Sequence, residues 1–222
     1  MILRSLVKQG AVDPAPERGW SEPTEGSQWI VGRAQSSEDR PLWVLVWGCI
    51  TDVAQAVHDD PSIKSRIRVY SIGSWNTRMD RAARDYLFND HPDLWWIEAD
   101  STFRGMYIGG IQEGDWGNQQ FVERHVRGHG SMGDLFFHKK PDIKMGDTPS
   151  LLYLLCGDPD DPTALHWGGS FSRSDHGANY WTDDTTPAKA EGDHPGARTV
   201  NAWRCAYLQD WRDRMPGTGS NP

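Results

Sequence analysis

The sequence has no apolar run that approaches the roughly 20 residues needed to cross a bilayer, which argues against a membrane-spanning segment. Its opening stretch, MILRSLVKQGAVD, lacks an apolar region long enough for a signal peptide. The three cysteines, Cys49, Cys156 and Cys205, are widely spaced and form neither a zinc motif nor an evident disulfide framework. Positive charge is scarce as well, and the net charge of -8 argues against a nucleic-acid backbone or an anionic membrane as a partner.

The chain is rich in tryptophan, although its hydrophobic content is only 37%. Its 222 residues fit one domain, or one domain with a small extension. Each of the 12 Trp can bury a large area, so we expect most of them in the core. Tryptophan also stacks on sugars and bases, which leaves a binding role open for some of them. The sequence contains no G-x-S-x-G elbow, no P-loop and no G-x-G-x-x-G fingerprint.

The segment Pro41–Val57 has the pattern of a strand, a tight turn and a helix. Leu42–Trp47 is apolar without alternation, which is typical of a strand buried on both faces. Gly48 ends the strand, and Thr51 or Asp52 is predicted to cap the helix that follows. Ligands of open α/β sheets bind at the carboxyl ends of strands. The turn is therefore either a ligand site or only a well-formed βα connection.

The same alternation continues along the chain. Ile67–Ile72 and Leu94–Ala99 are predicted strands, and Asp80–Asn89 is a predicted helix with one apolar face. Three strands alternating with two helices predict a parallel, right-handed α/β sheet. The remaining predictions are a short helix or strand at Gln28–Ala34, helices at Asn118–Arg127, from Gly130, from Pro149 and at Thr199–Met215, and irregular chain at Asp13–Ser27, Arg104–Gly117 and Gly157–Gly196.

Several polar clusters are candidates for chemistry. The turn Asp158–Asp161 holds three carboxylates, which suits either calcium or ordinary solvated turn residues. Asp147 precedes a predicted helix, where it could cap the helix or face a ligand. His125 and His129 have helical i,i+4 spacing, but Gly128 lies between them and weakens any metal role.

Three ordered motifs resemble those of the nucleoside hydrolase superfamily. The first is Gly48–Asp52, at the place of that superfamily's G-P-L-T-N turn. The second is Asn76, four residues before Asp80 in NTRMDRAA. The third is Gly146–Leu155, GDTPSLLYLL, at the place of a His-Asp-Pro motif before an apolar helix.

A closer resemblance is to a bacterial, nucleoside hydrolase-like branch of that superfamily that is associated with cellulose binding. It extends over nearly all of residues 27–215. The segments that carry it are RPLWVLVWG, HPDLWWIEAD, FRGMYIGG, KMGDTPSLLYLL, GDPDDP, HWGG and the closing WR…DWRDRM.

The resemblance implies a fold and a domain layout. It predicts a three-layer α/β/α, Rossmann-like domain with a mainly parallel sheet. Residues 1–215 would be the C-terminal portion of such a domain, with its first strands missing, and residues 216–222 would be a disordered tail. It also suggests a bacterial periplasmic or secreted protein.

The resemblance further implies a calcium-assisted sugar site. Calcium takes oxygen ligands and lowers the pKa of a bound water, which could attack an anomeric carbon through an oxocarbenium-like transition state. The implied roles are calcium binding by the backbone carbonyl of Thr51 and the carboxylate of Asp147, and a hydrogen bond from Asn76 to a sugar hydroxyl. Trp75, Trp167 and His166 are further predicted substrate contacts.

The chain departs from the superfamily pattern at three points. No D-x-D-x-x-x-D-D cluster precedes the strand at Leu42. Ser74 stands where the pattern has a glutamate, two residues before Asn76. Gly146 stands where the pattern has a histidine that acts as leaving-group acid, and His166 or Asp158 could replace it.

Three functional hypotheses follow. The first is a glycosidase-like hydrolase that uses a calcium-activated water and is incomplete in this chain. The second is a non-catalytic carbohydrate-binding protein, favoured by the tryptophan excess, which includes Trp95, Trp96, Trp116, Trp167 and Trp181. The third is a degenerate domain without activity. The expected partner is a carbohydrate or a nucleoside-like small molecule, and homo-oligomer formation stays open.

Overall fold

The computed structural model describes residues 6–36 and 39–215, which form two compact units. Unit 1 comprises the chain up to Asp100 together with Arg173–Thr182. Unit 2 comprises Ser101–Ser172 and the chain from Asp183 onward. The predicted disordered tail, residues 216–222, lies outside the described residues, and the predicted domain boundary stays a prediction. No described helix is both long and apolar enough to cross a membrane.

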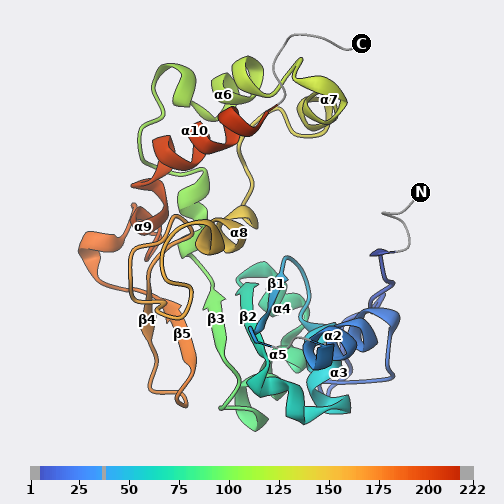
Figure 1. Ribbon diagram of the computed structural model, residues 1–222. Coiled ribbons are helices and arrows are strands. Elements are labelled where there is room, and N and C mark those ends of the chain that lie inside the picture. The colour runs from blue at the N-terminus through green and yellow to red at the C-terminus, as the bar shows by residue number, and fades with distance from the viewer. Residues whose placement is uncertain (1–5, 37–38, 216–222) are drawn as a thin grey trace. The chain divides into compact units, whose positions relative to one another are not determined.

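A five-stranded, mostly parallel sheet forms the framework, so the predicted α/β class is confirmed (Figure 1). β1 pairs with β2 in parallel, β2 with β3, and β3 with β5. The pairing places Leu42 opposite Ile67 and Val69 opposite Trp96. In spatial order the strands are β1 (Leu42–Val46), β2 (Ile67–Ile72), β3 (Trp96–Ala99), β5 (Tyr180–Asp183) and β4 (Phe171–Arg173).

Three helices of unit 1 bury their apolar faces against this sheet. They are α2 (Glu25–Ser36), α3 (Thr51–Asp59) and α5 (Arg81–Asp90). Ala56 and Val57 of α3, Leu87 of α5 and Val69 of β2 are fully buried in one shared core. Because helical residues three and four apart share a face, the spacing of these apolar residues forms α3 and α5 and directs them onto the sheet.

The N-terminal end of α3 differs from its predicted cap. Neither Thr51 nor Asp52 caps the helix, because Ile50 occupies the N-cap position. The Asp52 carboxylate instead accepts hydrogen bonds from the Ala11 N–H and from the Thr24 hydroxyl, the latter at 2.6 Å. These partners are distant in sequence, so they are not visible in the local pattern. Asp52 thereby ties the extended segment before α2 to the start of α3.

Three regions were predicted less well. The polar stretch predicted as irregular contains β4 and β5, which complete the sheet. These strands have three and four residues, too few for a recognisable alternation. The turn before Asp80 contains a short helix, α4 (Trp75–Met79). The single closing helix is two helices, α9 (Arg198–Asn201) and α10 (Arg204–Arg214).

Unit 2 is helical around its own core. Its other α-helices are α6 (Asn118–His125), α7 (Gly130–Lys139) and α8 (Thr148–Leu155). The buried Arg204 guanidinium donates to the backbone carbonyls of Met106 and Trp116 and to the side chain of Asn118. One side chain thus joins α10 to the segments at Met106, Trp116 and Asn118 and pairs with their polar groups. Short 3-10 turns connect these helices at Thr102–Met106, Gly114–Trp116 and Pro187–Lys189; within unit 1, Pro61–Ser65 forms a similar turn.

Candidate functional site

The carboxyl ends of β1, β2 and β3 meet at one edge of the sheet in unit 1, because these strands are parallel. The turns that leave this edge are Gly48–Thr51 after β1, Gly73–Asn76 after β2, and Asp100 after β3. The Asp100 carboxylate accepts a hydrogen bond from the Ser74 N–H. A Cβ atom on Gly73 would lie 2.0 Å from that carboxylate, so only glycine allows this close approach.

Ser74 has a strained backbone. Its φ of 61° and ψ of -107° make it the only non-glycine residue with positive φ among the described residues. Such conformations cost about 1–3 kcal/mol and persist only where the surroundings enforce them. Here the hydrogen bond to Asp100 helps to enforce the turn. This turn of two residues, Gly73 and Ser74, connects β2 directly to α4.

Helix α4 carries two of the predicted substrate contacts. The Asn76 side-chain amide donates to the Ile72 carbonyl at 2.9 Å, which fixes its orientation. The Trp75 side chain is 63% exposed, and the Arg78 guanidinium lies 5.3 Å from its ring centroid. A second exposed tryptophan, Trp47, follows β1 at the same edge. The edge therefore presents aromatic surface next to polar groups.

Thr51 lies at this edge, but its hydroxyl group is occupied. It donates to the Asp80 carboxylate at 2.6 Å, and both residues are buried. The same carboxylate accepts a hydrogen bond from the Ala15 N–H. Partial burial and the nearby Asp80 charge raise the pKa of the Cys49 thiol. The Thr51 hydroxyl is therefore not available to a ligand, and the calcium-binding role predicted for Thr51 concerns its backbone carbonyl alone.

The hollow between these turns is small. Its volume of about 10 Å³ equals roughly one water molecule's probe sphere. Asn76, Thr77 and Glu98 contribute to its walls. A sugar ring or a base cannot enter it, so a ligand bound at this edge would lie on its surface, against the exposed tryptophans.

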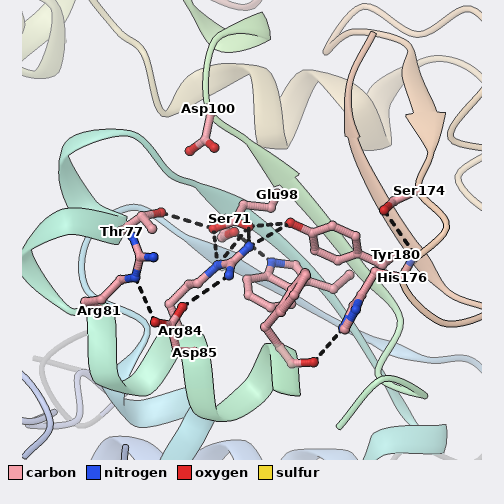
Figure 2. Close-up of polar contacts among 12 residues, drawn as sticks. Ser71, Thr77, Arg81, Arg84, Asp85, Glu98, Asp100, Ser174, His176 and Tyr180 are labelled. Carbon is pink, nitrogen blue, oxygen red and sulfur yellow. Dashed lines mark hydrogen bonds and ion pairs between the residues drawn. The ribbon is translucent and has the colours of Figure 1, made fainter. Parts of the chain in front are cut away.

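A buried polar cluster lies beneath the edge (Figure 2). Glu98, on β3, is 1% exposed, and its carboxylate accepts hydrogen bonds from the Nε and Nη2 atoms of Arg84 of α5, the shortest at 2.7 Å. It also accepts from the Tyr180 hydroxyl of β5 and, at 3.1 Å, from the Thr77 hydroxyl of α4. Burial, together with the adjacent Glu98 charge, raises the pKa of Tyr180, so its hydroxyl stays protonated and donates.

Asp147 belongs to unit 2, where it immediately precedes α8. It occupies the N-cap position, but its side chain makes no capping hydrogen bond, so capping does not explain this residue. Burial raises the pKa of the Asp147 carboxyl group, and among the described residues no partner bonds to it. Partial burial disfavours the ionised form of this carboxyl group, and a bound cation would offset that cost.

The other two predicted substrate contacts, His166 and Trp167, lie in unit 2. His166 is fully buried, and its ring nitrogens face the backbone carbonyls of Cys156 and Asp161 at 3.1 and 2.9 Å. Its ring stacks on Tyr153, with the ring centroids 4.0 Å apart. Trp167 is partly buried and packs against the core of unit 2. Their predicted contacts with substrate stay untested.

The remaining candidate metal ligands behave as ordinary structural residues. Asp161 accepts hydrogen bonds from the Thr163 N–H and hydroxyl, which lower the pKa of its carboxyl group, as expected of a turn residue. His125 ends α6 and His129 precedes α7, so the two do not share a helix. Across residues 6–36 and 39–215, no three His, Cys, Asp or Glu side chains gather as a metal site.

Sequence reasoning missed Asp100 and Glu98. Asp100 directly follows the predicted strand Leu94–Ala99, and the rule that ligands lie at carboxyl ends would have selected it. Glu98 lies within that strand as a charged residue in an apolar run, which is a signal for a paired, buried charge.

Ser74→Gly is expected to stabilise the protein by about 1 kcal/mol, because glycine adopts this backbone without the strain. The measurement is the free energy of unfolding from urea denaturation. Ser65→Gly, at a residue with ordinary φ in the same unit, is the control and should be destabilising. A loss of stability in Ser74→Gly would contradict the inference that the Ser74 backbone is strained.

Asp147→Asn is expected to raise stability at neutral pH by less than about 1 kcal/mol. A pKa raised in the folded state means that the carboxyl group contributes stability below its unfolded pKa and loses it as pH rises through the folded value. The gain should therefore disappear when unfolding is measured well below the pKa of a free aspartate. Asp161→Asn, whose carboxyl pKa is lowered instead, should show the opposite sign. A destabilised Asp147→Asn at neutral pH would reveal a partner for this carboxylate.

Solved structures with the same fold include two nucleoside hydrolase-related proteins. One, from Saccharophagus degradans, is described as nucleoside hydrolase-related and associated with carbohydrate metabolism; it is 22% identical over 89% of this chain, with a TM-score of 0.64. The chain spans about half of that protein, 48% of its length. The other is the inosine-uridine preferring nucleoside hydrolase of Bacillus anthracis, 13% identical over 87% of this chain and 67% of its own, with a TM-score of 0.54.

At these identities the likeness establishes the fold, and no curated protein matches the sequence. The family evidence comes from the sequence itself. Residues 1–171 match the family model described as "Cellulose-binding Sde182, nucleoside hydrolase-like domain". The chain therefore belongs to the Sde182 nucleoside hydrolase-like family.

Proposed function

We propose that this domain binds carbohydrate at the carboxyl edge of the sheet in unit 1. The observation that carries the proposal is Trp75, an exposed indole placed beside Asn76 and a charged guanidinium at the end of a parallel strand. Sugar rings have apolar faces and polar rims, so they are bound by an aromatic surface flanked by hydrogen-bonding groups. Trp75 would stack on a sugar, and Asn76 and Asp100 would bond its hydroxyl groups.

The small size of the hollow between these turns favours an extended ligand at this edge. The space between the turns of unit 1 holds about 10 Å³, too little to enclose a nucleoside. A flat glucan chain needs no cavity, because it can lie across exposed rings such as those of Trp75 and Trp47. The cellulose-binding description of the family and the carbohydrate association of the Saccharophagus relative support this ligand class.

Trp75→Ala is expected to weaken binding of cellohexaose, a soluble β-1,4-glucan, at least tenfold, or about 1.4 kcal/mol. Isothermal titration calorimetry measures the affinity. Trp29→Ala is the matched control, because Trp29 is also exposed in unit 1 and also has a cation, Lys8, over its ring. Equal affinities for the wild type, Trp75→Ala and Trp29→Ala would place the ligand elsewhere, and no binding by the wild type would refute the proposal.

A second candidate is calcium-assisted glycoside hydrolysis, which the unpartnered carboxyl group of Asp147 favours. The Asp147 carboxylate would bind the ion, and a bound calcium would supply a water of lowered pKa. One carboxylate provides few of the roughly six to eight oxygens that calcium takes. The described residues contain no cluster of acidic side chains to supply the others, so they do not complete a calcium shell.

Calcium binding predicts thermal stabilisation. Free calcium at about 100 times its Kd should add about 2.7 kcal/mol of stability, seen as a raised Tm in differential scanning fluorimetry. Asp147→Asn should abolish the shift, whereas Asp158→Asn should leave it unchanged. A shift lost only in Asp158→Asn would assign calcium to the turn Asp158–Asp161. No shift in the wild type would count against a calcium site in this chain.

A further inference from the structure

The helix that carries the proposed sugar contacts has no apolar anchor. None of the five side chains of α4 is buried. A helix of this length is not stable by itself, so contacts with the rest of unit 1 must hold it. Its position at the edge therefore depends on polar contacts.

Three hydrogen bonds that involve a side chain hold α4 and its turn at the sheet, beside the backbone bond from the Gly73 N–H to the Ala99 carbonyl of β3. The Ser74 N–H binds Asp100, and the Asn76 amide binds the Ile72 carbonyl within the same turn. The third runs from the Thr77 hydroxyl to the Glu98 carboxylate at 3.1 Å. Of the three, only the bond of Thr77 reaches a buried charge, and Figure 2 shows it entering the cluster from the side of α4.

The acceptor in this third bond is rigidly held. Glu98 is clamped by Arg84 and Tyr180, and the Arg84 guanidinium lies 4.1 Å from the ring centroid of Phe88. Beside it, the Trp96 indole donates to the Ser71 hydroxyl at 2.8 Å. An acceptor fixed by α5, β3 and β5 gives Thr77 a single preferred position, and Thr77 is the residue after Asn76.

We propose that Thr77 and Glu98 are positioning residues for the carbohydrate site: the buried carboxylate holds α4 through the Thr77 hydroxyl, so that Trp75 and Asn76 face the ligand. The ligand part of this inference rests on the proposed function. Thr77 and Glu98 themselves do not touch the sugar. Their effect on affinity is exerted through the placement of the two contact residues.

Thr77→Val tests the role of the hydroxyl, because valine keeps the shape of threonine and removes the donor. Glu98 keeps Arg84 and Tyr180 in this variant, so the fold should survive with only a small loss of stability. Cellohexaose affinity, measured by calorimetry, should fall at least fivefold. Thr77→Ser retains the hydroxyl and should restore most of that affinity.

Hydrogen exchange provides a readout that does not need the sugar. In Thr77→Val the amides of residues 75–79 should exchange faster, while those of β2 and β3 keep wild-type protection. If the wild type binds and Thr77→Val keeps both its affinity and its α4 protection, the positioning role is refuted and the proposed function stands. Equal losses in Thr77→Val and Thr77→Ser also refute the role of the hydroxyl. If the wild type itself does not bind, the proposed function and this inference fall together.

Discussion

The buried negative charge of Glu98 constrains how unit 1 can be assembled. A carboxylate inside a protein must be paired and hydrogen-bonded, and removing one partner of such a pair costs about 3–5 kcal/mol. Glu98 meets this requirement only when Arg84 of α5 and Tyr180 of β5 are both in place. The apolar core supplies the driving force for folding. The Glu98 charge disfavours any arrangement in which α5 and β5 do not bring their partners to β3.

The sheet edge above this charge combines strain with exposure. Gly73 allows the Asp100 carboxylate to lie close to the backbone, and Ser74 has a strained backbone conformation with positive φ. Trp75 of α4 is exposed to solvent. Each feature costs stability by itself, and none contributes to the core. Features of this kind are retained where they present side chains to a ligand, which is why this edge is a stronger candidate than the buried surroundings of His166.

The predictable part of the fold consists of local patterns. The apolar runs at Leu42–Trp47 and Ile67–Ile72 gave strands within a residue of their observed ends, because buried parallel strands need no polar alternation. β5 was not predictable, since its four residues join the sheet through distant partners on β3. The site divides in the same way: resemblance selected Asn76, which lies at the edge, but the hydrogen bond from Thr51 to Asp80 depends on tertiary contacts.

Unit 1 is not continuous in sequence, because its segment Arg173–Thr182 is synthesised after most of unit 2 has begun to emerge. It belongs to unit 1, although 72 residues of unit 2, Ser101–Ser172, precede it in the chain. On the ribosome, Glu98 therefore emerges long before its hydroxyl partner Tyr180. When residues 1–100 have been synthesised, the Glu98 carboxylate still lacks its partner Tyr180. Unit 1 can therefore be completed only after Ser101–Ser172 of unit 2 have been translated.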